Sequence, residues 1–184
     1  NHITNFRFSN YENFVNNKPD QYHFPTVLSN ILSNRAGLCI TLNYAFSRYL
    51  HFHGFDNKLI KCFKINKTGM YDTIYHVGII VKIENTEYFV DEAYGNYFFE
   101  AIRLVDDFAT NDITIKKIKN DYKIFIKGRE ILYLDMENIN LHDLNKFYII
   151  WLNLPPHYNG LTTYLWEAIF DQNLGDYKKF SSKM

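Results

Sequence analysis

The sequence predicts an α+β fold, in which an N-terminal helical bundle is followed by an antiparallel β-sheet or small β-barrel and then by a C-terminal helix. Two observations lead to this prediction. In the first third of the chain, apolar residues recur with helical spacing. In the middle, short runs rich in β-branched and aromatic residues are separated by turn residues. A block of helices followed by a block of strands is typical of an α+β protein.

Two helices are predicted in the N-terminal third. Four apolar residues between positions 27 and 32 fall at i, i+1, i+4 and i+5, which suits one face of a short helix. A longer helix is predicted to begin at Cys39, because apolar residues recur from there at helical intervals. We expect this helix to end at His53-Gly54, since glycine is favoured at a C-terminal cap.

The sheet is predicted from short runs that follow residue 57. The first three cover 58–65, 74–83 and 87–91, with a turn between the last two. Further short runs follow at 98–105, 113–118, 122–126, 131–135 and 147–154. Residues 161–170 have helical spacing and predict the C-terminal helix, with a Lys-rich tail behind it. We therefore expect one compact unit made of a helical lobe over 1–56, a sheet lobe over 57–160, and a helix with its tail over 161–184.

Composition and charge exclude several classes of protein. Twenty basic residues balance twenty acidic ones, so the sequence has no electrostatic footprint for nucleic acid or an anionic membrane. It has no run of about 18 apolar residues, so we expect no transmembrane helix. With two cysteines and no Cys-x-x-Cys spacing, we expect no metal site. We expect a cytoplasmic location, but the chain begins with Asn1 and a removed leader stays open.

Cys39 is the candidate nucleophile. The thiolate is the reactive form of cysteine, and the unpaired N–H groups and positive dipole end of a helix N-terminus stabilise it. The same N–H groups can bind the oxyanion of a tetrahedral intermediate, and Gly37 permits a close approach of the backbone. Taken alone, a single cysteine is more often a small buried side chain.

His76 and Asp91 complete a candidate triad, because a thiol nucleophile needs a base and the base needs an orienting partner. His76 lies on the second predicted strand and Asp91 ends the third. If the hairpin register places residue 76 opposite residue 93, His76 and Asp91 are diagonal neighbours with Cβ atoms roughly 7–8 Å apart. Other registers stay open. Taken alone, His76 would more often be a core histidine, and Asp91 could simply cap a strand end.

At these residues the sequence resembles the arylamine N-acetyltransferase family. That family has an Arg-Gly-Gly-x-Cys motif at a helix start and an Asn four residues after the cysteine. It then has a His on a strand and, fifteen residues on, the Asp of a Val-Asp-x-Gly-Phe-Gly element. The residues that match are Arg35, Gly37, Cys39, Asn43, His76, Val90, Asp91, Tyr94 and Gly95.

The resemblance implies a cysteine-protease-like fold and a ping-pong acyl transfer. Cys39 would take an acyl group from acetyl-CoA or another acyl thioester, and a small-molecule amine would collect it. His76 would be the base and Asp91 its orienting partner. Tyr94 and Gly95 would bind the substrate. The resemblance implies no metal and no bound cofactor besides the thioester co-substrate.

Three further residues, Arg35, Gly37 and Asn43, would support the site. The sequence departs from the family pattern at Ala36, Thr41 and Ala93. The chain also ends soon after the predicted barrel. We therefore expect the family's third domain, which helps to shape the coenzyme A cleft, to be absent or reduced to one helix.

Two alternative functions stay open. Transglutaminase-like enzymes also present Cys, His and Asp in this order, and such an enzyme would act on a protein Gln or a peptide bond. A catalytically degenerate binding domain on the same fold is the other alternative, since a fold does not guarantee a function. Arg35 and Asn43 favour the acetyltransferase interpretation. The expected partners are an amine and an acyl thioester, with a protein substrate under the first alternative.

Overall fold

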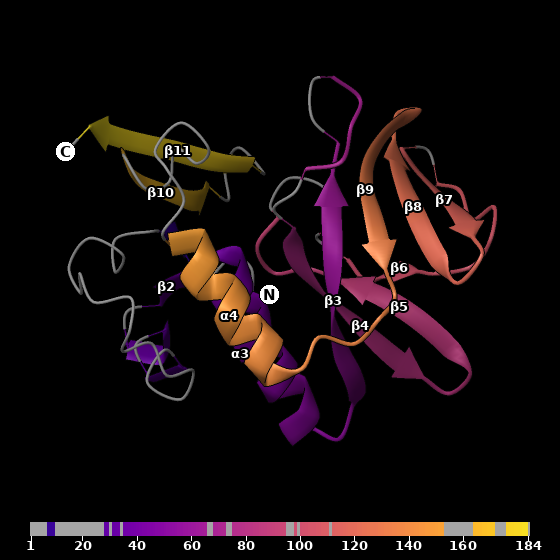
Figure 1. Ribbon diagram of the computed structural model, residues 1–184, viewed down its shortest axis with the longest axis horizontal. Coiled ribbons are helices and arrows are strands. Elements are labelled where there is room, and N and C mark those ends of the chain that lie inside the picture. Colours follow the sequence, from indigo (N-terminus) through magenta and orange to yellow (C-terminus); the bar gives the residue numbers. More distant parts are fainter. Residues whose placement is uncertain are drawn as a thin grey trace. The chain divides into compact units, whose positions relative to one another are not determined.

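The computed structural model describes residues 7–9, 28–29, 31–33, 35–65, 68–72, 75–94, 98, 100–110, 112–152, 164–171 and 176–183. The chain divides into two units. The first comprises Asn1–Phe46, Glu92–Phe99 and Asn140–Met184, and the second comprises Ser47–Asp91 and Glu100–Ile139. Each unit has its own β-sheet, and strands β2 to β11 are labelled in Figure 1.

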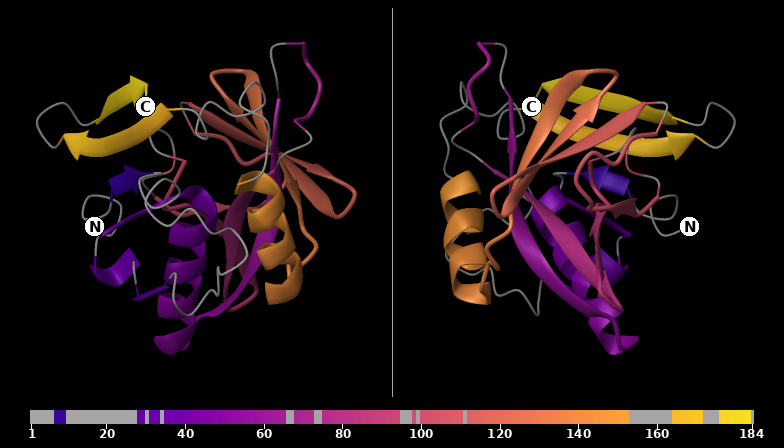
Figure 2. Two further views of the ribbon diagram at one scale, coloured as in Figure 1. Left: turned by 60° about the vertical axis from the view of Figure 1, so that its left-hand side comes forward. Right: turned by 90° about the vertical axis from the view of Figure 1, so that its right-hand side faces the viewer.

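The second unit is built on a seven-stranded sheet with the order β6-β5-β4-β3-β9-β8-β7. Its strands are β3 (Asp56–Lys64), β4 (His76–Ile83), β5 (Thr86–Val90), β6 (Ile102–Arg103), β7 (Ile113–Ile118), β8 (Asp121–Ile126) and β9 (Arg129–Asp135). Every ladder between them is antiparallel. The strands twist across the width of the sheet, as Figure 2 shows. The predicted antiparallel sheet is confirmed.

β4 lies in the interior of this sheet and is buried on both faces along its first six residues. Val77 and Ile79 point to one face and are fully buried, and Ile80, on the other face, is 2% exposed. A strand that is apolar on both sides is typical of a position covered on both faces. His76, at the start of β4, is the polar exception in this run.

Two-residue turns connect β4 to β5 and β8 to β9. Glu84 has φ 54° in the turn between β4 and β5. Lys127 and Gly128 have φ 51° and 78° between β8 and β9. Positive φ at both central residues is what a type I′ hairpin turn requires. The strands predicted at 122–126 and 131–135 are confirmed as β8 and β9, which form a hairpin.

Helix α3 (Cys39–Phe52) begins at the predicted residue, and its end is set by Gly54. Gly54 has φ +84°. The Phe55 N–H donates to the Leu50 carbonyl and the Gly54 N–H to the His51 carbonyl, both at 3.0 Å. This is the Schellman arrangement of a helix C-terminus, which needs a residue in the left-handed region. The N-terminal half of α3 belongs to the first unit and the C-terminal half to the second.

The first unit holds a four-stranded sheet with the order β11-β10-β1-β2. Its strands are β1 (Arg7–Ser9), β2 (Ala36–Gly37), β10 (Tyr164–Asp171) and β11 (Asp176–Lys183). β1 runs parallel to β2 and antiparallel to β10. The N-terminal segment, the residues just before Cys39 and the C-terminal segment therefore share one sheet.

The prediction of a C-terminal helix over 161–170 is wrong, because β10 occupies Tyr164–Asp171 and pairs along its whole length with β11. The Lys-rich tail is likewise a strand. The spacing of apolar residues in so short a run fits either structure. The residue types decide it, since Tyr164, Trp166 and Phe170 are aromatic and favour strands.

The apolar run at 147–154 lies mostly in a helix, α4 (Leu141–Leu152). Asn140 caps it: its Oδ1 accepts the Asp143 N–H at 2.9 Å, and its carbonyl accepts the Leu144 N–H at 3.0 Å. Asparagine is among the favoured N-cap residues. The apolar run alone could not separate strand from helix, whereas the Asn-x-x-Asp spacing before it was the available signal.

Within the predicted N-terminal helical lobe, residues 1–6, 10–27, 30 and 34 lie outside the described residues. Positions 28–29 and 31–33 are helical, which agrees with the short helix predicted there.

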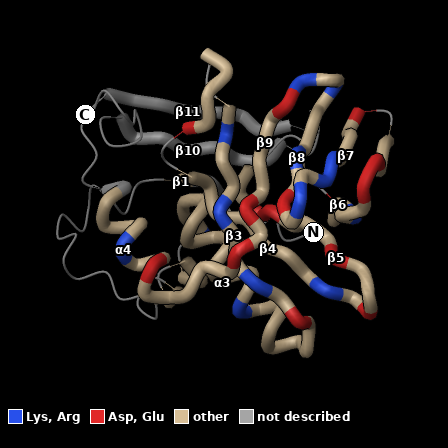
Figure 3. Tube along the Cα trace, turned by 45° about the vertical axis from the view of Figure 1, so that its right-hand side comes forward, with Lys and Arg blue, Asp and Glu red and all other residues tan. Residues whose placement is uncertain are grey.

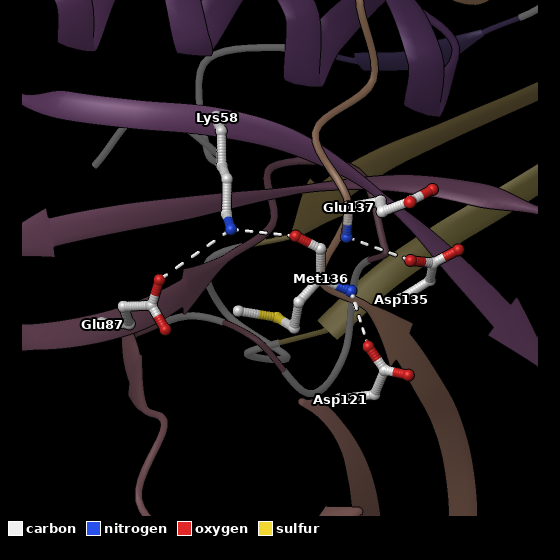
Figure 4. A network of polar contacts seen from close by, with 6 residues as sticks. All are labelled: Lys58, Glu87, Asp121, Asp135, Met136 and Glu137. Atoms are coloured by element: carbon white, nitrogen blue, oxygen red, sulfur yellow. Dashed lines mark hydrogen bonds and ion pairs between the residues drawn. The ribbon is translucent and has the colours of Figure 1, made fainter. Parts of the chain in front are cut away.

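A polar network fastens the second unit where the chain leaves β9 (Figure 4). Lys58 Nζ donates to the Met136 carbonyl at 2.9 Å and lies 4.0 Å from Glu87 Oε1. The Met136 N–H donates in turn to Asp121 Oδ1 at 3.1 Å. Side chains from β3, β5 and β8 are thus joined through one residue, Met136, of the connection to α4.

Candidate active site

His76 and Asp91 are hydrogen-bonded to each other inside the second unit. His76 Nε2 lies 2.5 Å from Asp91 Oδ2. The two side chains are 3% and 0% exposed. A carboxylate buried this fully is stable only when it is paired or hydrogen-bonded, and hydrogen bonds to an ionised acceptor are the short ones. The structure therefore brings two of the three predicted catalytic residues into direct contact.

The strand register explains how this pair forms. β4 and β5 pair Ile79 with Val90 and Ile83 with Thr86. Continued toward the start of β4, the same register places Asp91 opposite position 78 and diagonal to position 76. This is the register in which residue 76 faces residue 93. Diagonal neighbours on one face of a sheet are within reach of long side chains.

The residues next to this pair are tightly packed. Cys62 is fully buried and pairs with His76 across the β3–β4 ladder. A Cβ atom at Gly78 would lie 2.5 Å from Phe89 Cε2 and 2.8 Å from Cys62 Sγ. Gly78 was not among the residues predicted to belong to the site. A glycine inside an otherwise apolar strand was the available signal, because it marks a close approach.

Cys39 is the first residue of α3 and is a half-buried thiol in the first unit. Thr41 secures this start of the helix. Its Oγ1 accepts the Leu38 N–H at 2.9 Å and donates to the Leu38 carbonyl at 3.0 Å. A side chain at the third helical position that reaches back to the N-cap N–H is one half of a capping box. Thr41, which departs from the family pattern, therefore has a local structural role.

The packing around position 37 leaves no room for a side chain, so glycine is required there. A Cβ atom at this position would lie 2.7 Å from Thr41 Oγ1 and 3.2 Å from Leu42 Cδ2. The close backbone approach predicted at Gly37 is therefore confirmed. Its neighbour is the hydroxyl that caps α3.

Asn43 and Arg35 have different local roles. Asn43 is fully buried, and its Oδ1 accepts the N–H of Glu92 at 2.8 Å. It thereby joins α3, one turn after Cys39, to the segment that follows Asp91 in the chain. Arg35 is exposed, has φ 49°, and donates its N–H to the Ile31 carbonyl at 2.8 Å. That bond and the left-handed backbone are those of a helix C-cap.

The predicted substrate-binding residues lie at and beyond the edge of the described segment. Tyr94 is half-buried, and its ring centroid lies 5.2 Å from that of Phe98. Gly95 lies outside the described residues. Ala93, another departure from the family pattern, packs against the buried pair Ile31 and Leu42.

A second polar cluster in the second unit has raised pKa values. Tyr133 donates a hydrogen bond to Asp121 Oδ2, and this bond raises the pKa of Tyr133 to about 12. Tyr71 and Lys123 donate to the two carboxylate oxygens of Glu130 at 2.8 and 3.0 Å. Burial raises the pKa of Tyr71, and the hydrogen bond with Tyr71 raises the pKa of Lys123.

Charged residues of both signs are interspersed along the strands of the seven-stranded sheet (Figure 3). Within the part of the chain that the structure describes, no three His, Cys, Asp or Glu side chains gather as a metal site would need. Nor is any helix among the described residues long and apolar enough to cross a membrane.

The N-acetyltransferase family model matches residues 1–143 of the chain. An uncharacterized acetyltransferase of Acanthamoeba polyphaga mimivirus is 30% identical over 182 residues. The matched region covers 95% of this chain and 89% of the viral protein.

Solved arylamine N-acetyltransferases share the fold. The Bacillus cereus enzyme, described as having a Cys-His-Glu catalytic triad, matches with a TM-score of 0.78 at 18% identity and covers 97% of this chain and 74% of its own. The Mycobacterium marinum enzyme in complex with CoA matches with a TM-score of 0.78 at 13% identity, covering 99% and 77%. Because the family model spans most of the sequence, the chain belongs to the arylamine N-acetyltransferase family of enzymes, as its motifs around Cys39 and Asp91 predicted.

Proposed function

We propose that the protein transfers an acetyl or related acyl group from a coenzyme A thioester to an aromatic amine, through a triad of Cys39, His76 and Asp91. The observation that carries the proposal is the buried hydrogen bond between His76 and Asp91, which supplies the oriented base that a thiol nucleophile needs. Membership of the family supports acetyl transfer. The CoA complex of the M. marinum enzyme supports a CoA thioester as the donor.

Asp91 fixes the tautomer of His76. An ionised carboxylate can only accept hydrogen bonds, so His76 carries its proton on Nε2 and donates it to Asp91 Oδ2. The lone pair of the neutral imidazole is then on Nδ1, which is the nitrogen that accepts the proton of the Cys39 thiol. The imidazolium formed in this step is stabilised by the adjacent buried carboxylate.

The start of α3 favours the charged forms of the nucleophile and of the intermediate. Cys39 is the first helical residue, and the N-terminal end of a helix favours negative charge. N–H groups of the first turn can receive the oxygen that becomes negative when the carbonyl is attacked. Thr41 holds this turn in place through its two bonds to Leu38.

The reaction follows as two half-reactions. The Cys39 thiolate attacks the thioester carbonyl, and the C–S bond to coenzyme A breaks. Coenzyme A leaves as a thiol with a proton from His76, and the acyl group stays on Cys39. The amine nitrogen then attacks this new thioester and loses a proton to the imidazole of His76. Cys39 leaves with the electron pair of its C–S bond, which regenerates the pair of thiolate and imidazolium.

Tyr94 and Gly95 would bind the acceptor. Tyr94 already contacts one ring, that of Phe98, and an aromatic amine would add a further ring-to-ring contact. The preference for an aromatic over an aliphatic amine would come from this contact.

Intact-mass measurement on the full chain tests the proposal directly. Incubation with acetyl-CoA should add one acetyl group to Cys39, and an arylamine or hydrazide should then remove it. Cys39→Ser is the control, and it should lose the thioester adduct. The proposal is wrong if no CoA thioester acylates Cys39 while a Gln-containing protein is deamidated.

The rate of alkylation gives a separate test of the nucleophile. Iodoacetamide should label Cys39 faster than a model thiol near pH 7, because only the thiolate reacts. An equal rate would contradict a thiolate stabilised by the helix and would favour a catalytically degenerate domain.

A further inference from the structure

We infer that Gly78 is a positioning residue for the His76–Asp91 pair. Because Gly78 has no side chain, Cys62 and Phe89 can pack close to the pair. Their packing keeps the imidazole and the carboxylate positioned for their hydrogen bond. The inference rests on the proposed function only in that it takes this pair to be the catalytic base; the contacts themselves lie wholly within the second unit.

Gly78 lies on β4, which pairs with β3 on one side and with β5 on the other. On β4 it shares a face with His76, two residues earlier. Across the β3–β4 ladder it pairs with Ile60, while His76 pairs with Cys62. In the β4–β5 register it lies opposite Asp91, the residue that follows β5. Gly78 is therefore adjacent to both members of the pair.

The space that a side chain at position 78 would need is already filled. A Cβ atom there would lie 2.5 Å from Phe89 Cε2, 3.1 Å from Phe89 Cζ and 2.8 Å from Cys62 Sγ. Both neighbours are fully buried. An aromatic ring is rigid, so it moves as a whole, and a packed interior has little room for it to move. Even a methyl group at position 78 therefore requires these neighbours to shift.

The two neighbours that would shift are those that flank the pair. Phe89 precedes Asp91 by two residues and lies on the same face of β5. Cys62 lies across the ladder from His76. A shift of the Phe89 ring would disturb the position of the Asp91 carboxylate. A shift of the Cys62 sulfur would disturb the position of the His76 imidazole. Either displacement would weaken the His76–Asp91 hydrogen bond, because such a bond depends steeply on distance and angle.

The effect of a substitution at Gly78 comes from space and not from backbone strain. Gly78 is paired in a regular antiparallel ladder, where residues of every type adopt the extended backbone. A larger side chain should therefore be tolerated once its neighbours are made smaller. This property separates a positioning role, which depends on Phe89 and Cys62, from a requirement for glycine itself.

A double-mutant cycle tests the inference. The variants are Gly78→Ala in the native chain, and Gly78→Ala in a background opened by Phe89→Leu and Cys62→Ala. Two quantities are measured for each: the NMR signals of the His76 imidazole across pH, and the rate of Cys39 acylation by acetyl-CoA. The matched reference for each variant is the same background with Gly78 retained.

In the native chain, Gly78→Ala should change the tautomer and titration signals of His76 and slow acylation by about tenfold or more, since a base that is misplaced loses most of its contribution. In the opened background the same substitution should leave both quantities near those of its reference. Non-additivity of this kind is what a shared contact produces.

The inference is overturned if Gly78→Ala lowers only the melting temperature and leaves the His76 signals and the acylation rate intact. It is also overturned if the substitution perturbs His76 equally in both backgrounds. Should the native-background variant fail to fold, the opened background alone decides, because altered His76 signals there contradict the inference. If no thioester acylates the wild-type Cys39 but the NMR result holds, the proposed function falls and the positioning role stands.

Discussion

At the scale of single residues, the proposed site depends on one buried carboxyl group. Asp91 is 1% exposed, and the hydrogen bond with His76 stabilises it in that position. In the proposed mechanism the same bond orients the imidazole. A substitution at Asp91 must therefore separate its structural role from the proposed chemical one.

Asp91→Asn keeps the size of the side chain and removes its charge. The amide cannot stabilise an imidazolium and can donate to the ring, which favours the wrong tautomer. We expect acylation of Cys39 by acetyl-CoA to slow by about two to four orders of magnitude. Stopped-flow or quenched-flow acylation kinetics measure this. Glu92→Gln is the control, since it changes the adjacent carboxyl group and retains the backbone N–H that Asn43 accepts. Unchanged kinetics in Asp91→Asn would contradict the triad.

Tyr133 gives a prediction on pH that is independent of the site. Its hydrogen bond to Asp121 raises its pKa from 10.0 to about 12, so folding favours the protonated phenol. The stability that this bond contributes, about 1 kcal/mol, is present in full below about pH 10 and is lost as the pH rises toward 12. Tyr133→Phe should therefore be less stable than the wild type at pH 8, with the difference shrinking as the pH approaches 12. Urea unfolding at a series of pH values checks this, and a constant difference would contradict it.

At the scale of elements, the first turn of α3 determines where Cys39 lies. Leu38 is a poor N-cap residue, and Thr41 compensates from within the helix. Gly37 leaves room for the Thr41 hydroxyl. β2 and α3 are thus connected by a short, closely packed turn, and the position of Cys39, the proposed nucleophile, depends on it.

Thr41→Val removes the hydroxyl and keeps the shape. We expect the free energy of unfolding to fall by about 1–2 kcal/mol, because the Leu38 N–H and carbonyl both lose a partner. Cys39 should also react more slowly with iodoacetamide as the turn frays. Thr41→Ser, which retains the hydroxyl, should stay close to the wild type in both chemical denaturation and alkylation. Equal behaviour of the two variants would show that the cap has no influence on the thiol.

At the scale of the whole molecule, β1 joins segments that are far apart in the sequence. It pairs with β2, which leads directly into Cys39, and with β10 near the C-terminus. Because β1 is paired on both sides, its backbone groups are not left open as those of an edge strand are. The C-terminal hairpin of β10 and β11 therefore supports the segment that leads into Cys39, the proposed nucleophile.

Ala168→Pro should break this support, because Ala168 pairs with Phe8 of β1 and with Lys179 of β11, and proline cannot donate to a ladder. We expect faster hydrogen exchange in 7–9 and 36–37 and a lower melting temperature, with the amides of β3 and β4 still protected. Ala168→Val keeps the N–H and is the matched control. Protection of β1 that survives the proline would contradict the role of the hairpin.

Much of the second unit could be predicted from local sequence signals. The three strands β3, β4 and β5 follow from short runs of apolar, β-branched and aromatic residues, and a turn at residue 84 sets the register of β4 and β5. Once the register is known, the contact between His76 and Asp91 follows. The predicted start of α3 at Cys39 was also confirmed, since the apolar spacing and the residues before it agree.

The sequence by itself determined the family, the residues of the His76–Asp91 pair and the start of α3, because motifs and turn residues act over a few positions in the chain. Tertiary structure decided the rest. Strand β10 replaced a predicted helix because its pairing with β1 and β11 outweighed an ambiguous local spacing. The closeness of Gly78 to Phe89 and Cys62 arises from three strands, and no local pattern records a distance across a sheet. Propensity and periodicity act along the chain, whereas packing acts between segments that the chain separates.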